Sequence, residues 1–209
     1  STVNMQAYIN DLEALRIHLK LDKMMLLGHS WGGMLGMAYA ATFPTHVQEL
    51  ILLGPGGPTK KFLSYFGHNI LFRLHEEDLE EWRQLISEGK PGTKGYWPGY
   101  FYSREKALET KSNIDFDKLP GQDGIFDLAM NDYVRTENER VALLKNFKGS
   151  VELIQGRQDP IGESTAYEIK EVLPQTQLHF IEQCGHLLWL EDIPGLSDFI
   201  AALNKALAE

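Results

Sequence analysis

The segment Lys23-Met-Met-Leu-Leu-Gly-His-Ser-Trp-Gly-Gly33 decides how the rest of the chain is interpreted. It begins with a short, mainly apolar run that stops at Gly28, which predicts a buried β-strand. The small residues of 31–42 follow, and they predict a helix. Ser30 therefore stands where a strand passes directly into a helix.

The residues around this junction, Gly28-His-Ser30-Trp-Gly32, form a G-x-S-x-G motif. A strand that turns so sharply into a helix holds its serine in a strained backbone conformation. We expect a side chain at either flanking position to clash in the turn, so that both positions are glycine. The hydroxyl then projects at the carboxyl end of the sheet, where open α/β sheets bind ligands. The helix N-terminus favours negative charge developing there, and we predict that Ser30 is a nucleophile.

Two other interpretations of the motif were weighed. A glycine-rich turn with a solvated serine stays open as an alternative. A dinucleotide-binding loop is suggested by the four glycines between residues 28 and 36. Such a loop needs an acidic residue at the end of the next strand to hold a ribose. The next predicted strand, Val47–Leu53, ends in Leu-Leu-Gly54 without an acid, so this interpretation is rejected.

His186 is the candidate base for this serine. A serine hydroxyl is a weak nucleophile until a base takes its proton. Among the seven histidines, His186 follows the predicted strand Leu178–Ile181 in a loop that can reach the carboxyl edge of the sheet. His179 falls inside that strand and is expected to be packed. A solvated loop histidine remains the alternative for His186.

Asp159 is the candidate acid. It follows the predicted strand Val151–Gln155, which places it at the same edge of the sheet as the serine and the histidine. A carboxylate in contact with the base fixes its tautomer and stabilises the imidazolium. The alternative is an Asx-type turn before Pro160. Glu191 and Asp192 are weaker candidates, because they precede a predicted helix and resemble N-terminal helix charges.

The order of predicted elements defines the domains. Helix, strand, helix and strand alternate up to residue 57, which indicates a parallel sheet. Residues 58–147 carry only helical signals, including a capping box at Thr136-Glu-Asn-Glu139. The alternation resumes afterwards and ends in a helix that starts at Pro194. We therefore predict an α/β fold with a mostly parallel sheet, a core of residues 1–57 and 148–209, and an inserted helical cap of residues 58–147.

The first and last helices are predicted from apolar residues at three- and four-residue spacing. The first face consists of Met5, Tyr8, Leu12, Leu15 and Leu19, and the last of Leu196, Phe199, Ile200, Leu203 and Leu207.

Composition limits the possible partners. The net charge of −9 repels phosphate backbones, so nucleic acid is not an expected partner. No run of 18 apolar residues occurs, so we expect no membrane span. The single cysteine, Cys184, is expected to be buried and points to a reducing compartment, hence a cytoplasmic location. No cofactor is expected.

Three motifs together carry a family resemblance: Gly28-His-Ser-Trp-Gly-Gly33, Gly156-Arg-Gln-Asp159 and Gly185-His186. In their order along the chain they resemble the α/β-hydrolase superfamily. The tryptophan after the serine and the helical cap are most similar to its proline iminopeptidase branch. The resemblance implies a catalytic triad of Ser30, Asp159 and His186, with the backbone N–H of Trp31 as one oxyanion donor.

The resemblance also implies a substrate class. It predicts a serine hydrolase that acts through an acyl-enzyme on a small molecule or short peptide, as an aminopeptidase releasing N-terminal residues. Family members hold the substrate's ammonium group with cap carboxylates, for which Glu76–Glu81 is a candidate cluster; a solvated helix face is the alternative. The aromatic run Tyr96–Tyr102 could line a pocket or pack the cap onto the sheet. A carboxylesterase, a carbon–carbon bond hydrolase with the same triad, and a non-catalytic ligand-binding relative stay open.

The sequence departs from the family in its number of strands. Four strands are predicted, corresponding to the last four of the usual eight, so only the C-terminal half of the family's sheet is expected. The strand at 23–27 would then have an unpaired apolar edge. We expect an N-terminal segment of the same protein to pair there and to supply the second oxyanion donor.

Overall fold

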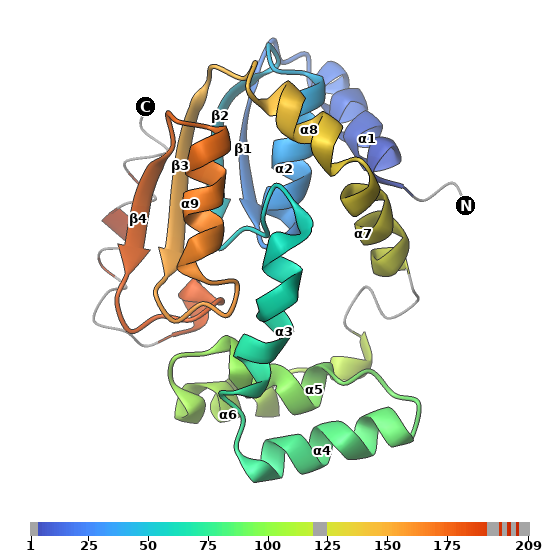
Figure 1. Cartoon of the computed structure of the whole chain (residues 1–209), viewed down its shortest axis with the longest axis vertical. Coiled ribbons are helices and arrows are strands. Elements are labelled where there is room, and N and C mark those ends of the chain that lie inside the picture. Colours follow the sequence, from blue (N-terminus) through green and yellow to red (C-terminus); the bar gives the residue numbers. More distant parts are fainter. Residues whose placement is uncertain (1–3, 119–124, 192–196, 198–199, 202–203, 205–209) are drawn as a thin grey trace.

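The computed structural model describes residues 4–118, 125–191, 197, 200–201 and 204. At its centre is a four-stranded parallel sheet with the spatial order β1-β2-β3-β4 (Figure 1). The strands are β1 (Met24–His29), β2 (Val47–Leu53), β3 (Ser150–Gly156) and β4 (Gln177–Ile181). The predicted α/β class and parallel sheet are confirmed.

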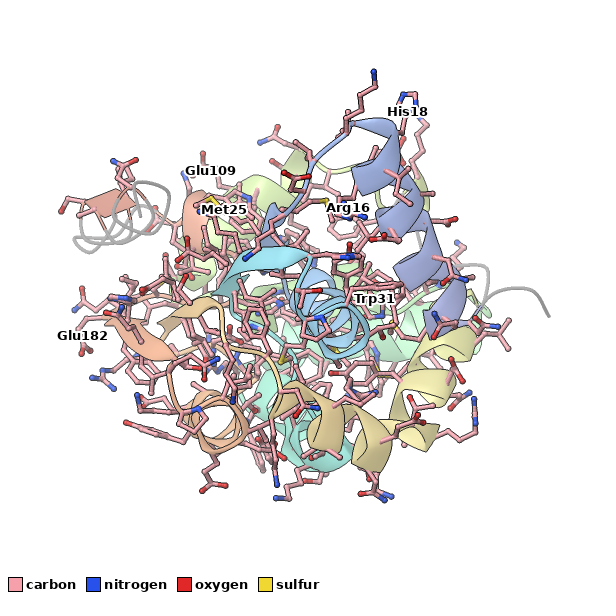
Figure 2. The ribbon with its side chains drawn as sticks, turned by 90° about the horizontal axis from the view of Figure 1, so that it is seen from above. Arg16, His18, Met25, Trp31, Glu109 and Glu182 are labelled. Atoms are coloured by element: carbon pink, nitrogen blue, oxygen red, sulfur yellow. The ribbon has the colours of Figure 1, made fainter. Side chains whose placement is uncertain are left out.

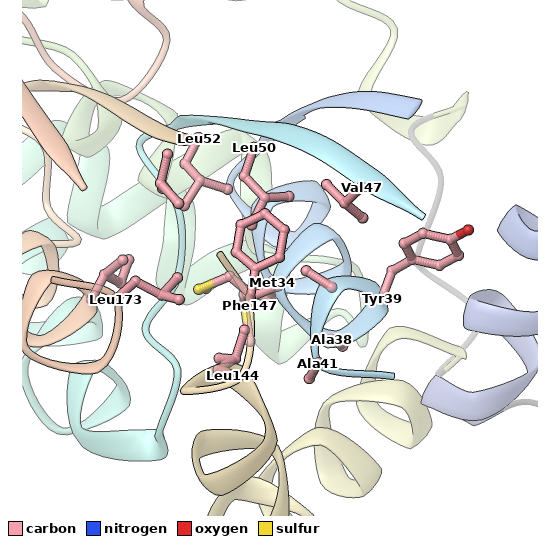
Figure 3. Packing of buried hydrophobic residues seen from close by; sticks show 14 of the residues in the cluster. Met34, Ala38, Tyr39, Ala41, Val47, Leu50, Leu52, Leu144, Phe147 and Leu173 are labelled. Carbon is pink, nitrogen blue, oxygen red and sulfur yellow. The ribbon is translucent and has the colours of Figure 1, made fainter. Parts of the chain in front are cut away.

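One face of the sheet is covered mainly by α2 (Trp31–Thr42), which contacts β1 and β2. Glycine and alanine on this helix allow its backbone to approach the sheet closely; a Cβ built on Gly36 would lie 3.6 Å from Leu50. Met34, Leu52 and Phe147 belong to the same buried cluster (Figure 3). The dense core beneath the strands gives Ser30, at the start of α2, a rigid support.

Of the remaining helices, α9 packs on β3, and most of the others lie in two places (Figure 1). The helices α3, α4, α5 and α6 lie beyond the carboxyl ends of the strands, whereas α7 and α8 pack beside α1 and α2. Their bounds are α1 (Met5–His18), α3 (Leu63–Leu71), α4 (Glu76–Ser87), α5 (Thr93–Tyr96), α6 (Arg104–Ser112), α7 (Ile125–Arg135), α8 (Glu137–Leu144) and α9 (Glu163–Val172), with short 3-10 turns at Lys60–Phe62, Trp97–Tyr100, Phe116–Lys118 and Leu188–Leu190. The division into a core and a cap at residues 58–147 stays a prediction.

The apolar face predicted for α1 is covered at its N-terminal end and exposed at its C-terminal end. Met5 and Ile9 are buried, but Leu15 is 48% exposed and Leu19 is 53% exposed. Tertiary packing explains this difference in burial along α1. The helix contacts α2 and α7, and the Met5 N–H at its start donates to Asp132 of α7 at 2.9 Å. Within the described part of the chain, the later turns of α1 have no comparable cover.

The predicted capping box at Thr136 is not formed, although α8 begins at the next residue. Thr136 has φ −98° and ψ 10°, and its hydroxyl donates to the Asp132 carbonyl at 3.0 Å. Because α7 ends at Arg135, Thr136 continues the helical path and its side chain bonds backwards by four residues instead of capping forwards. By contrast, the Ser103 side chain caps α6 by accepting the Lys106 N–H at 3.2 Å.

The predicted C-terminal helix lies largely outside the described residues, including Pro194, Leu196, Phe199, Leu203 and Leu207. The described positions in this stretch, residues 197, 200–201 and 204, are helical.

The strand β1 is an edge of the sheet in the described residues. It pairs in parallel with β2 on one side, and Leu27 at its centre is 50% exposed. Met25, labelled in Figure 2, lies on the same strand and is half-buried. The expected unpaired apolar edge is therefore present in this structure.

Candidate active site

Ser30 joins β1 to α2 through a strained turn. Its backbone has φ +53° and ψ −117°, in a region that residues with side chains rarely adopt. The Ser30 N–H donates to the Leu53 carbonyl at 3.0 Å, and its own carbonyl accepts from the Gly33 N–H at 3.1 Å. The strand-to-helix elbow predicted from the motif is present.

The flanking glycines have different roles. A Cβ on Gly28 would lie 2.4 Å from the Gly32 carbonyl oxygen, so this position accepts only glycine. A Cβ on Gly32 would meet nothing within 4 Å, so the expected clash there is wrong. The second close approach is at Gly33, where a Cβ would lie 2.8 Å from Pro55. The turn is therefore tight at Gly28, against the backbone of Gly32, and at Gly33, against Pro55, whereas the Gly32 Cβ position is open.

Asp159 and His186 form a buried pair. The His186 Nδ1 lies 2.9 Å from the Asp159 Oδ2, and both side chains are almost fully buried. The other carboxylate oxygen, Oδ1, accepts the Ile161 N–H at 2.8 Å. The Asx-type turn and the histidine contact are therefore not alternatives, because each uses a different oxygen of the same carboxylate.

Gly54 packs directly against this pair and was not identified from the sequence as a site residue. It has φ +44°, and a Cβ there would lie 2.5 Å from the Asp159 Oδ2 and 3.2 Å from the His186 Nδ1. The sequence did contain a signal for this role, because Gly54 closes the predicted strand between the strand that leads to Ser30 and the strand that leads to Asp159. Only glycine combines this backbone conformation with this close approach.

His29 holds the backbone of His186 from the elbow. Its Nε2 donates to the His186 carbonyl at 2.9 Å, and the two rings lie 4.5 Å apart between centroids. Burial, with a smaller contribution from neighbouring His186, lowers the pKa of His29 to about 4. His29 is thus neutral near pH 7 and acts as a hydrogen-bond donor.

Tyr100 also holds His186, through its backbone carbonyl and its ring. The His186 N–H donates to the Tyr100 carbonyl at 2.7 Å, and the two rings stack with centroids 5.4 Å apart and planes 27° apart. Burial raises the pKa of the Tyr100 hydroxyl, so it stays protonated. His186 is therefore bound through its ring, its N–H and its carbonyl, and is not a solvated loop histidine.

Ser30 lies beside the Asp159–His186 pair, but in the described residues its hydroxyl is not hydrogen-bonded to His186. Ser30 directly follows His29, whose ring contacts His186. In the described residues, the hydrogen bonds of the His186 ring and backbone reach Asp159, His29 and Tyr100, and none reaches the Ser30 hydroxyl. The pairing of base and acid is present, whereas contact between Ser30 and His186 stays a prediction.

Trp31 is the first residue of α2, where a backbone N–H has no partner within the helix. Its indole ring packs edge-on against Tyr8 of α1, with centroids 5.1 Å apart (Figure 2 labels Trp31). The N–H is free of intrahelical bonding at the position expected of an oxyanion donor, and that role stays a prediction.

An apolar pocket of about 270 Å³ lies next to Tyr100. Its lining residues come from α3, α4 and the aromatic run, and they are Phe66, Gly67, Ile70, Leu71, Trp82, Tyr96 and Tyr100. Phe66 and Tyr100 also contact the His186 ring. Of the two roles expected for the run at 96–102, the pocket lining is present at Tyr96 and Tyr100. Trp97 packs against Phe101 and Phe116, within residues 58–147.

The acidic cluster Glu76–Glu81 is largely ion-paired. Asp78 is buried and receives two hydrogen bonds from Arg104, both at 3.1 Å. Glu81 pairs with Lys94 and Lys111. These pairs favour a structural role for the cluster.

Cys184 lies near His186 in the sequence but is not suited to act as the nucleophile. Burial raises the pKa of the Cys184 thiol to about 12, so the thiol is protonated at neutral pH and is a poor nucleophile. In the part of the chain that the structure describes, no group of three His, Cys, Asp or Glu side chains could hold a metal ion.

The parallel sheet, the strained serine turn and the buried Asp–His pair define a class of protein. The chain belongs to the alpha/beta hydrolase fold family, whose sequence model matches residues 1–193. Among curated proteins, it is 35% identical to a proline iminopeptidase of Arabidopsis thaliana over 94% of this chain. It is 23% identical to a 2-hydroxy-6-oxo-2,4-heptadienoate hydrolase of Pseudomonas putida, over 94% of this chain and 70% of that protein.

A solved structure of similar fold is the thermophilic esterase of Thermogutta terrifontis, with a TM-score of 0.65 and 19% identity. The match covers 97% of this chain and 72% of the esterase. This chain spans 59% of the length of the Arabidopsis relative. Among the described helices, none is both long enough and apolar enough to cross a lipid bilayer.

Proposed function

We propose that this chain carries the catalytic residues of a serine hydrolase that works through an acyl-enzyme. The observation that carries the proposal is the buried 2.9 Å contact between His186 and Asp159 beside the strained turn at Ser30. A solvated serine turn would not require a buried imidazole–carboxylate pair next to it. The same pair argues against a non-catalytic relative.

The proposed reaction begins with proton transfer to the histidine. Since Nδ1 of His186 donates to Asp159, Nε2 is free to accept the proton of the Ser30 hydroxyl. The serine oxygen then attacks the substrate carbonyl, and the Trp31 N–H stabilises the oxyanion. Collapse of the tetrahedral intermediate returns the proton to the leaving group and leaves an acyl-serine. Water, activated by the same histidine, releases the acyl group and restores Ser30.

For the substrate, we propose a short peptide whose N-terminal residue is removed, as in a proline iminopeptidase. Two observations support this choice: the 35% identity to the Arabidopsis protein of that name, and an apolar, aromatic pocket beside the base that suits a compact apolar side chain. The ion pairs of Glu76–Glu81 weaken the suggestion that this cluster binds the substrate's ammonium group.

The second candidate is a carbon–carbon bond hydrolase or carboxylesterase. The similarity to the Pseudomonas putida hydrolase and the shared fold of the esterase favour it. The pocket also supports it, because its lining offers few polar groups to recognise an amine.

Hydrolysis of paired substrates tests the choice. Aminoacyl-arylamides with proline, alanine and leucine should be compared with acyl esters of the same size, with the proline arylamide expected to give the highest kcat/KM. Turnover of esters alone would remove the aminopeptidase proposal while leaving the serine hydrolase in place.

We also propose that β1 pairs with an N-terminal segment of the same protein, which would supply the second oxyanion donor. The half-exposed Leu27 and the single-sided pairing of β1 support this. A stable and fully active monomer made from these 209 residues alone would refute it. A cytoplasmic location stays a proposal that rests on the single cysteine.

A further inference from the structure

Glu191 is a buried carboxylate that the reaction described above does not use. It is 1% exposed, although the sequence predicts a surface charge before a helix. Its Oε1 accepts the Gly185 N–H at 2.7 Å and the Tyr102 N–H at 2.8 Å, and its Oε2 accepts the Ser103 N–H at 3.2 Å. One carboxylate therefore bridges two segments that are distant in sequence.

These two segments also meet directly. The His186 N–H donates to the Tyr100 carbonyl, so the backbone of 185–186 lies along that of 100–103. A Cβ on Gly185 would lie 2.2 Å from the Tyr100 oxygen and 2.7 Å from the Glu191 Oε1. This packing is tight, so any shift of residues 100–103 must either move the loop that carries His186 or break these hydrogen bonds.

A second link joins the same region to the acid. The guanidinium of Arg73, which lies between α3 and α4, donates to the Gln158 carbonyl next to Asp159. The Gln158 side chain in turn accepts the Cys184 N–H at 3.1 Å. The positive charge of Arg73 also acts on Glu191 and Asp159. Burial raises the pKa of Glu191, while the three N–H donors and the charge of Arg73 oppose this rise and favour the carboxylate.

We propose that Glu191 is a positioning residue for the catalytic base: its carboxylate fixes the segment 100–103 to the histidine loop, so that the orientation of His186 depends on the position of that segment. The inference rests on the proposed function of His186 as a base. It assigns Glu191 no direct contact with the substrate.

The test compares Glu191→Gln with Glu168→Gln in the whole protein. The amide keeps the size of Glu191 but loses one acceptor oxygen for the three N–H groups. Glu168 of α9 is also buried and accepts from Thr59 at 2.6 Å, but it lies outside the histidine loop and serves as the matched control. We expect kcat to fall on the order of 10- to 100-fold in Glu191→Gln, with KM within about threefold and Glu168→Gln near the wild type.

A readout independent of turnover is the NMR signal of the His186 ring protons. In the wild type the Nδ1 proton shared with Asp159 should give a downfield resonance, and Glu191→Gln should shift or broaden it while Glu168→Gln leaves it unchanged. An unaltered resonance with unaltered kcat would overturn the proposal, as would equal losses in both variants. If the wild type is inactive, the proposed hydrolase function fails, but the resonance still tests whether Glu191 positions His186. The failure of one proposal can therefore be distinguished from the failure of the other. Glu191→Asp, which keeps the charge but shortens the reach, replaces the amide variant if that variant does not fold.

Discussion

The loop of His186 and the strand that leads to Ser30 differ in how they are held. His186 is bound through its ring, N–H and carbonyl by Asp159, Tyr100 and His29. The strand β1 is paired on one side, and its Leu27 is half exposed. The base is therefore held by residues of this chain, whereas the nucleophile follows a strand, β1, that is paired on only one side in the described residues.

The largest expected effect comes from removing the nucleophile itself. Ser30→Ala removes the attacking oxygen, so we expect kcat/KM to fall by roughly 10⁴-fold or more, with stability little changed because alanine keeps the Cβ and therefore the same backbone strain. Steady-state kinetics and thermal unfolding measure the two quantities. Retention of more than a hundredth of the activity would assign the chemistry to another residue.

The next effect tests how tightly the base and acid are packed. Gly54→Ala places a Cβ 2.5 Å from the Asp159 carboxylate at φ +44°, so we expect a loss of roughly 2–4 kcal/mol in the free energy of unfolding, together with most of the activity. Gly32→Ala is the control for stability, because its Cβ meets nothing within 4 Å. Similar unfolding free energies for the two variants, measured in urea, would contradict the described packing.

A smaller effect concerns His29, the neutral histidine whose ring lies next to that of His186. The pKa of His29 is lowered to about 4, so the unfolded chain binds more protons than the folded one between about pH 4 and 6.5. Stability should therefore fall as the pH drops through this window, by about 3 kcal/mol in full. His29→Asn should lack this part of the acid destabilisation. Urea unfolding of both proteins at pH 7 and pH 5 should show about 2 kcal/mol of this loss in the wild type, and an equal loss in both proteins would contradict a buried neutral His29.

The smallest effect probes the open edge. Leu27→Lys should change the stability of the 209-residue chain by no more than about 0.5 kcal/mol, because the side chain is half exposed there. In a protein that carries the proposed N-terminal segment, the same change should cost clearly more, since Leu27 would be covered. Ile86→Lys on α4, at 52% exposure, should cost equally little in both. Equal effects of Leu27→Lys in the two proteins would argue against pairing at β1.

The sequence was most informative where structure depends on short patterns. The strand Val47–Leu53 was predicted with its observed bounds, because it is an apolar run closed by glycine. The pairing of Asp159 with His186 followed from loops after two parallel strands. Gly54 was missed, and Glu191 was interpreted as a helix charge, because their roles depend on close approaches between distant segments, which leave no periodic signal. Contact of His186 with Ser30 remains a prediction.

Reaction with a fluorophosphonate probe, followed by mass-spectrometric location of the adduct, tests the central claim most directly. We expect one phosphonylated residue, Ser30, in the wild type, and labelling at least 100-fold slower in His186→Ala. An adduct on another residue, or labelling of Ser30 at the same rate without His186, would contradict the proposal that His186 activates this serine.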